Sequence, residues 1–392
     1  MKILKTIFGL IVGMVIALAS VMLIIWLIEA GTDAPAETVD AGEKEIDWIL
    51  MAISIALSLL FCGVGIVVHT ILHEAGHLLF GIATGYKFVS FRIFNRMIAK
   101  EKDGLKVRKF SIVGTMGQCV MEPPCHTEQV PFFWYNAGGV AMNILLTAVA
   151  ILLLRSYDLE IVPMSALLMI AFTGILMAVI NGVPFPITDV SNDGRNILLL
   201  AKNKGNRRHF ACSLLIVASL HKGVRLREMP KEWFDGSALS NSKNVFDITR
   251  RTLWLYRLED EGKYVEARKI AEEMTAKDMK LSQVIRNEMR CEQVLLELLT
   301  ENRREVVDTL WTKSLQSYVK ATSKYSAGRL VVLYAYELLY NHDASTADTY
   351  RKTLEEKRHD FASPGDTITA IDICREIERK YQESITESSS NK

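Results

Sequence analysis

The chain has 392 residues, of which 49% are hydrophobic and 23% charged, and its formal net charge is +1. This balance speaks against a nucleic-acid-binding protein, and six scattered cysteines without C-x-x-C spacing speak against a disulfide framework or a cysteine zinc site. The long apolar runs lie mostly before residue 190, whereas the rest is rich in Lys, Arg and Glu. We therefore expect a protein of the lipid bilayer with a water-soluble part, and no nucleic-acid partner.

Four segments are long and apolar enough to span a bilayer, whose core needs about 20 apolar residues. They cover residues 7–28, 48–86, 132–154 and 161–183. The first continues its apolar run past the small residues 17–20, so we expect an uncleaved N-terminal anchor rather than a signal peptide.

The charges of the connecting loops predict the orientation of these spans. The loop 29–47 is acidic, whereas the segment 87–109 carries eight Lys and Arg residues. By the positive-inside rule the basic segment lies in the cytosol, and so do both termini. The expected location is the cell membrane, with several spans.

The second apolar segment carries the most informative motif of the chain, His73-Glu74-Ala75-Gly76-His77. On a helix the two histidines of an H-E-x-x-H motif lie one turn apart on one face and can bind a single Zn²⁺, with Glu74 as a base for a zinc-bound water. Since 25 residues separate Trp48 from His73, or roughly 38 Å of helix against a hydrocarbon core of ~30 Å, the motif is expected near the cytosolic side of the membrane.

A catalytic zinc site needs a third protein ligand, and the end of the fourth span offers two candidates. Pro184 and Pro186 break the helix, and Asp189 and Asp193 follow at the same depth as the histidines. A carboxylate ligand would leave the fourth zinc position open for water.

Between the second and third spans, residues 86–131 form an insert with extended character. Segments 88–94 and 105–112 are rich in β-branched and aromatic residues and flank a charged turn, 100–104, which predicts a β-hairpin. Residues 114–121 could add a further strand. An exposed sheet edge could hold an extended substrate by main-chain pairing, and the alternative is a packed cytosolic connector.

Other polar residues have plainer interpretations beside functional ones. His69 shares a helical face with His73 and His77, but three histidines in a row span ~12 Å, so we expect His69 to support the site or simply to pack. Asn143 could donate to an oxyanion or form a helix-helix hydrogen bond. Cys125 and His126 follow two prolines and are expected in a loop without metal.

Together these features resemble the site-2 protease family of intramembrane zinc metalloproteases. The resemblance covers residues 48–200 and rests on His73-Glu74-Ala75-Gly76-His77, the hairpin region, Gly138-Gly139-Val140-Ala141-Met142-Asn143, and Asn181 with Pro184, Pro186 and an Asp-Gly pair. It implies zinc bound by His73, His77 and an aspartate, Glu74 as general base, substrate contacts by Asn143 and Asn181, and cleavage of a membrane-anchored substrate.

Two departures from the family pattern concern Asn143 and the aspartate. Val140 stands where proline is usual, which weakens the role of Asn143. Asp189 has the usual distance from the prolines, whereas Asp193 has the following Gly194. We favour Asp193 as the zinc ligand, because Asp-Gly followed by residues 195–198 best continues the family pattern.

The C-terminal half shows an internal spacing of 40 residues. Three sets of apolar residues keep this spacing: Leu258, Leu298 and Leu338; Leu255, Leu295 and Ala335; Ala267, Val307 and Ala347. Polar turns separate helical patterns within each unit, which predicts stacked helix hairpins and weakly resembles tetratricopeptide repeats. Such arrays usually bind a protein partner, and the alternative is a plain helical bundle.

The expected fold is mainly α: a polytopic membrane domain of about four transmembrane helices, a small β-hairpin or sheet, and a cytosolic helical-repeat domain. The expected parts are an anchor with an external loop (1–46), a zinc metalloprotease core (47–200), the helical repeats (201–383) and a disordered tail (384–392).

The expected function is intramembrane cleavage of a membrane-anchored protein or peptide precursor by a zinc metalloendopeptidase, as in regulated intramembrane proteolysis. A competing interpretation is a catalytically silent membrane scaffold whose repeats bind a partner. Zinc transport or sensing would require further polar residues in the spans, which are otherwise nearly bare.

Overall fold

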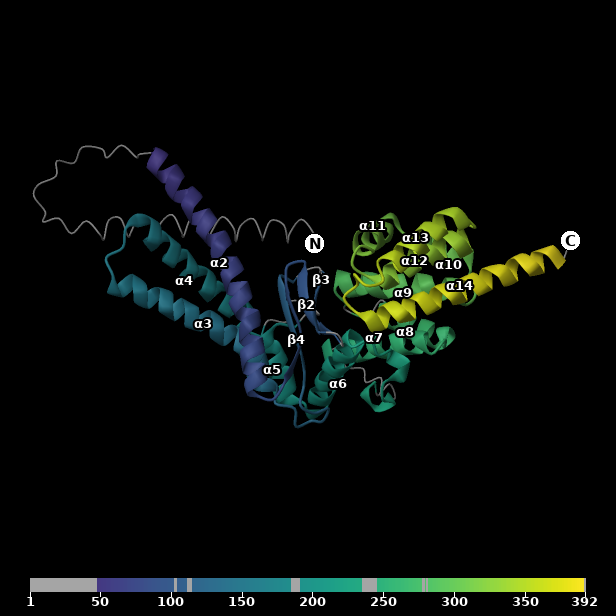
Figure 1. Cartoon of the computed structure of the whole chain (residues 1–392), viewed down its shortest axis with the longest axis horizontal. Helices are drawn as coiled ribbons and strands as arrows, with labels where there is room; N and C mark the ends of the chain where they lie inside the picture. Colours follow the sequence, from purple (N-terminus) through teal and green to yellow (C-terminus); the bar gives the residue numbers. More distant parts are fainter. Residues whose placement is uncertain are drawn as a thin grey trace, which may run out of the picture. The chain divides into compact units, whose positions relative to one another are not determined.

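The computed structural model describes residues 48–101, 104–110, 115–184, 191–234, 245–276, 279 and 281–390. Within these residues the chain is mainly helical, with thirteen α-helices and one antiparallel sheet of four strands (Figure 1). The expected mainly α fold is confirmed. The predicted first span 7–28, the loop 29–47 and Asp189 lie outside the described residues.

The chain divides into two units, one of residues 1–76 with 139–183 and one of residues 77–138 with 184–392. Helices α2 and α3 each continue from one unit into the other. This division differs from the expected boundary near residue 200, because the strand insert belongs to the same unit as the C-terminal helices. The physical reason is the apolar packing of Ala218 of helix α6 against Val89 and Val120 of the sheet.

Three helices are long and apolar enough to cross a membrane among the described residues: Ile55–Ala83 of α2 (Trp48–Ala83), α3 (Phe132–Ser156) and α4 (Ile161–Gly182). Only 22 to 28% of their most apolar windows is buried inside the structure, so most of the apolar side chains face outward. An outward apolar surface suits contact with lipid. These helices match the predicted second, third and fourth spans and indicate a membrane protein.

Small residues bring the helices of the first unit close together. A Cβ atom on Gly139 of α3 would lie 2.5 to 2.7 Å from three atoms of the His73 ring. A side chain on Gly174 of α4 would likewise collide with the His69 ring, and one on Gly65 of α2 with Thr173. Glycines at such contacts let membrane helices approach closely, as in small-residue packing motifs generally.

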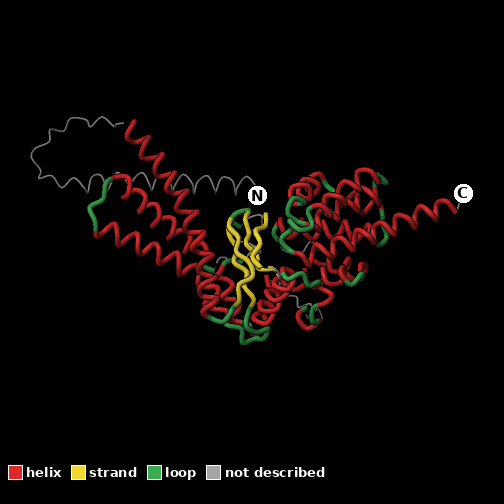
Figure 2. Tube along the Cα trace, in the orientation of Figure 1, coloured by secondary structure: helices red, strands yellow, loops and turns green. Residues whose placement is uncertain are grey.

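The strands of the insert lie side by side in one sheet (Figure 2). Their order is β3-β2-β1-β4, and all pairs are antiparallel. The strands are β1 (Lys87–Ile93), β2 (Arg96–Glu101), β3 (Gly104–Lys109) and β4 (Gly117–Glu122). The further strand expected within 114–121 is confirmed as β4.

The predicted hairpin partners were wrong. Segment 104–109 pairs with Arg96–Glu101, which we had not expected to be a strand, and this strand in turn pairs with β1. The missed strand buries Met97 and Ala99 at alternate positions, but its Arg and Lys residues resemble a charged turn. The signal of such a strand is burial at every second residue, rather than a large share of apolar residues.

Helices make up the rest of the second unit, with short 3₁₀ turns before α7. They are α5 (Asp193–Lys202), α6 (Lys204–His221), α7 (Val245–Asp260), α8 (Tyr264–Thr275), α9 (Gln283–Leu299), α10 (Arg304–Leu310), α11 (Lys313–Thr322), α12 (Ala327–Ala335), which continues into a π-helical turn at Tyr336–Tyr340, α13 (Ala344–Glu356) and α14 (Pro364–Ser390).

The spacing of 40 residues recurs in the backbone. Gly262, Asn302 and His342 all have positive φ, at 74°, 50° and 57°, and each ends the first helix of a hairpin. The apolar residues that define the spacing are buried, with Ala267, Val307 and Ala347 all at 0% exposure. The spacing read from the sequence is therefore the spacing of three helix hairpins.

The C-terminal segment differs from the expected disordered tail, because α14 continues to Ser390. Ion pairs of Arg379 with Glu376 and Glu383 link successive turns of this helix. The Thr386 hydroxyl also donates to the Gln382 carbonyl, at 2.9 Å. Such i,i+3 and i,i+4 interactions each stabilise an exposed helix by roughly 0.2 to 0.5 kcal/mol.

Candidate metal centre

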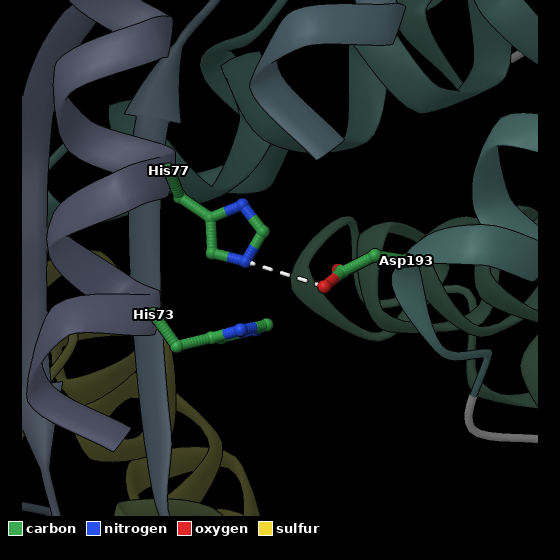
Figure 3. Close-up of side chains that lie close together, drawn as sticks. All are labelled: His73, His77 and Asp193. Atoms are coloured by element: carbon green, nitrogen blue, oxygen red, sulfur yellow. Dashed lines mark ion pairs between the residues drawn. The ribbon is translucent and has the colours of Figure 1, made fainter. Parts of the chain in front are cut away.

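The H-E-x-x-H motif lies on an uninterrupted stretch of α2, which runs for 36 residues. His73, Glu74 and His77 are all buried, with exposures of 7 to 8%. Because the helix is regular through the motif, the two imidazole rings project from the same face one turn apart (Figure 3).

Asp193 is the first residue of α5, and its position depends on the start of that helix. The Asn192 side chain caps the helix by accepting a hydrogen bond from the Arg195 backbone N–H at 2.9 Å. The Asp193 carboxylate thereby lies at the positive end of the helix dipole, where negative charge is stabilised. Its Oδ2 is 3.6 Å from Nε2 of His77 (Figure 3).

His73, His77 and Asp193 each offer one ligand atom, and these atoms all lie within 4.8 Å of one another. Zinc–ligand bonds of 2.0–2.2 Å place the ligand atoms of a tetrahedral site about 3.3 Å apart, so modest side-chain rotation would close the group on an ion. Two imidazoles and one carboxylate are a donor set of catalytic zinc sites. Among the described residues this is the one such group of His, Cys, Asp and Glu side chains.

The hydrogen bond of His77 fits a metal ligand. Its Nδ1 lies 2.7 Å from the Tyr135 backbone carbonyl, which can only accept. Nδ1 therefore carries a proton and donates, which puts the lone pair on Nε2, the ring nitrogen that lies 3.6 Å from Asp193. Metal-binding histidines commonly have their ring oriented in this way by a carbonyl or carboxylate.

His73 belongs to a hydrogen-bonded chain that joins α2, α3 and α4. The Asn143 side chain lies between Nδ1 of His73, at 3.1 Å, and Nδ1 of His69, at 3.2 Å. Nε2 of His69 lies 2.9 Å from the Ile170 carbonyl. His69 and Asn143 are both at 0% exposure, so these polar groups rely on one another for hydrogen bonds.

The Ile170 carbonyl determines which way the protons run in this chain. It can only accept, so Nε2 of a neutral His69 is the protonated nitrogen and Nδ1 must accept. The structure places Oδ1 of Asn143 toward Nδ1 of His69 and its amide nitrogen toward Nδ1 of His73, so this tautomer requires the reversed amide, with the nitrogen donating to His69 and the oxygen accepting from Nδ1–H of His73. The two orientations of an amide place heavy atoms almost identically, so the hydrogen-bond partners decide between them.

The chain of contacts bears on two open questions about supporting residues. Asn143 contacts His69 and His73, which is the helix-helix hydrogen bonding considered for it from the sequence. His69 lies at the far end of the same hydrogen-bonded chain and is not one of the three residues in the metal-ligand group. Gly139 was noticed only as part of a family-like stretch, although its position one turn before Asn143 on α3 could have indicated a shared contact with His73.

The remaining candidates are not members of the group of three ligands. Asn181 donates from its amide to the Met177 carbonyl of its own helix, at 2.9 Å. Cys125 and His126 lie in a loop and are not in the metal-ligand group among the described residues. Glu74 lies on α2 between the two histidines in sequence and is buried.

The fold and the cluster together define a class of protein: a chain with membrane-length apolar helices and a buried group of two histidines and one aspartate. Comparisons with protein-family models, with curated proteins and with solved structures find no match. The resemblance to site-2 proteases therefore rests on the motifs of the chain and the geometry of this group.

Proposed function

We propose that the chain is an intramembrane zinc endopeptidase that cleaves a membrane-anchored protein or peptide precursor. The observation that carries this proposal is the group of His73, His77 and Asp193, with Glu74 beside it on a membrane-length helix. Ionisable side chains within apolar spans are costly and are usually retained for function.

His73, His77 and Asp193 would hold the zinc ion. When bound, the ion would supply Lewis acidity, which polarises the scissile carbonyl and eases deprotonation of water. Glu74 would accept the proton of the attacking water and later deliver it to the leaving amine. The Tyr135 carbonyl and the Asn143 amide would keep the two imidazoles in the required orientation.

The sheet offers an edge for an extended substrate. Strand β3 is at one edge, and its Leu105 and Val107 are each 66% exposed. Unpaired backbone groups on such a strand can pair with an extended peptide, so we propose that substrate unwinds and adds to this edge.

The direct test is the substitution Glu74→Gln, which keeps the size of the side chain and removes the base. We expect zinc content to remain and turnover to fall by about 10²-fold or more, so that cells with the variant accumulate one membrane-bound precursor. The measurement is mass spectrometry of membrane peptides together with metal analysis of the purified chain. Identical membrane peptides in both cells would overturn the protease proposal and favour the scaffold.

The choice of aspartate has its own test. We expect Asp193→Ala to lose both zinc and turnover, whereas the matched variant Asp189→Ala keeps bound zinc. Zinc lost only from Asp189→Ala would transfer the ligand role to Asp189.

A further inference from the structure

His69 lies on α2 one helical turn before His73 and is not a member of the metal-ligand group. It is at 0% exposure within a helix of membrane length, where a polar ring needs a reason to be retained. The two hydrogen bonds of its ring reach other helices, one to Asn143 of α3 and one to Ile170 of α4. His69 therefore connects α4, which supplies none of the three ligands, to the hydrogen bonds of the metal centre.

Helix α4 holds the ring of His69 in one orientation. Nε2 lies 2.9 Å from the Ile170 carbonyl, and a half turn of the ring would put carbon atoms in place of both nitrogens and lose both hydrogen bonds. One turn further along α4, a Cβ on Gly174 would lie 2.5 Å from Cε1 and 2.6 Å from Nε2 of this ring. The ring thus packs directly on the backbone of α4.

The charge of His69 determines the orientation of the Asn143 amide. The Ile170 carbonyl only accepts, so Nε2 carries a proton. If Oδ1 of Asn143 faced Nδ1, that nitrogen would need a proton too, and His69 would be a cation with two uncharged hydrogen-bond partners. A buried charge without a charged partner is far more costly than a neutral imidazole. The neutral ring accepts at Nδ1 and turns the amide nitrogen of Asn143 toward itself.

The orientation of this amide in turn determines the tautomer of His73. The amide oxygen then faces Nδ1 of His73, which donates to it, and the lone pair of this ring is on Nε2. In the opposite orientation the amide nitrogen would donate to Nδ1, and Nε2 would carry the proton. A protonated ring nitrogen cannot bind a metal. Because Nδ1 is engaged with Asn143, Nε2 is the nitrogen that would bind the ion.

We propose that His69 is a positioning residue of the metal centre, which acts through Asn143 to select the zinc-binding tautomer of His73. It neither contacts the ion nor transfers a proton in the reaction. The inference rests on the zinc site of the proposed function and not on its peptidase chemistry. A chain that binds zinc as described below but cleaves nothing would contradict the protease proposal and leave this one standing.

The first test is ¹⁵N NMR of the full chain, labelled on histidine and prepared without metal in phosphatidylcholine vesicles. The His73 signals are identified by their loss in His73→Gln. We expect the proton on Nδ1 of His73 in the native chain and a shift toward Nε2 in His69→Leu, because the amide can then reverse. The matched control is Thr70→Val, a buried neighbour whose hydroxyl donates to the Ile66 carbonyl of its own helix, and it should keep the native tautomer.

Two results of this measurement would overturn the proposal. One is a proton on Nε2 of His73 in the native chain, and the other is an unchanged tautomer in His69→Leu. Thermal unfolding shows whether each variant folds.

The second test compares zinc affinities, measured by competition with a chelator, in two backgrounds. His69→Leu alone should weaken zinc binding by about 10-fold, as expected for loss of a group that orients a ligand. In Asn143→Asp both oxygens accept, so the orientation no longer matters, and adding His69→Leu should change the affinity by less than about 2-fold. Thr70→Val should bind zinc as the native chain does.

An equal loss in both backgrounds would show that His69 only packs, and would overturn the proposal. Absence of zinc binding by the native chain, or unchanged affinity in His69→Leu, would overturn it as well. If Asn143→Asp does not fold, the tautomer of His73 decides alone.

Discussion

The two units bury polar side chains in opposite ways. In the first, His69, Asn143 and His73 form a chain of hydrogen-bonded side chains that ends at the Ile170 carbonyl. In the second, Glu259 and Arg329 keep polar atoms without partners among the described residues, beside a cavity. The first arrangement fixes the orientation of a side chain, whereas the second leaves buried polar atoms whose lost hydration no hydrogen bond offsets.

The largest effect should follow from moving the His73 ring. Gly139→Ala places a methyl group within 2.7 Å of the ring, so the imidazole must shift and turnover should fall by about 100-fold. The matched control is Gly63→Ala on α2, where an added Cβ meets nothing within 4 Å. The measurement is cleavage of the accumulated precursor by each purified variant. Equal activity of the two variants would show that ring position is not fixed by this packing.

A smaller loss should follow from removing the hydrogen-bonding side chain between the histidines. Asn143→Leu keeps the branched shape of the side chain but leaves His73 without the group that orients its ring, and zinc affinity should fall by about 10- to 100-fold. Asn136→Leu is the control, since Asn136 is also buried on α3 but donates to the Phe132 carbonyl of its own helix. Competition with a zinc chelator measures both. Equal losses would mean that burial of an amide, rather than its contact with His73, is what matters.

The contrast between the units also explains what the sequence could predict. His73 and His77 are one turn apart on a single helix, so their spacing alone brings them together. Asp193 is more than 100 residues away, and only the Asp-Gly pattern suggested it. The buried cluster of Glu259, Glu292 and Arg329 had no such pattern, because its members come from three separate helices and each alone resembles a solvent-exposed charge.

The same distinction holds for the fold. The spacing of 40 residues predicted the positions of the hairpin turns, because each turn depends on local backbone geometry. The strand Arg96–Glu101 was missed because its charged residues outnumber the two side chains that it buries. A helix or strand can therefore be predicted from the sequence where most residues of its buried face are apolar. Burial that depends on contacts with distant elements cannot be predicted in this way.

The cluster in the second unit should respond to pH in a direction set by Glu259. Its folded-state pKa is raised by burial and by Glu292, against the opposing effect of Arg329, so the folded chain holds this proton more tightly than the unfolded chain. The associated stability is present at low pH and is lost as pH rises through the raised value. The melting temperature of the native chain should therefore gain on that of Glu259→Gln between pH 7.5 and pH 5.5. A constant difference would indicate that Glu259 is already ionised.

The smallest effect concerns the turns that repeat every 40 residues. Gly262 has φ of 74°, where a Cβ is strained, so Gly262→Ala should destabilise the chain by about 1 kcal/mol. Gly328→Ala is the same substitution on helix α12, where the nearest atom to an added Cβ is 3.9 Å away, and it should stabilise by about 0.5 to 1 kcal/mol. Chemical denaturation distinguishes the two by sign. Opposite signs would show that the positive φ of the turn residue, and not the replacement of a glycine as such, determines the change in stability.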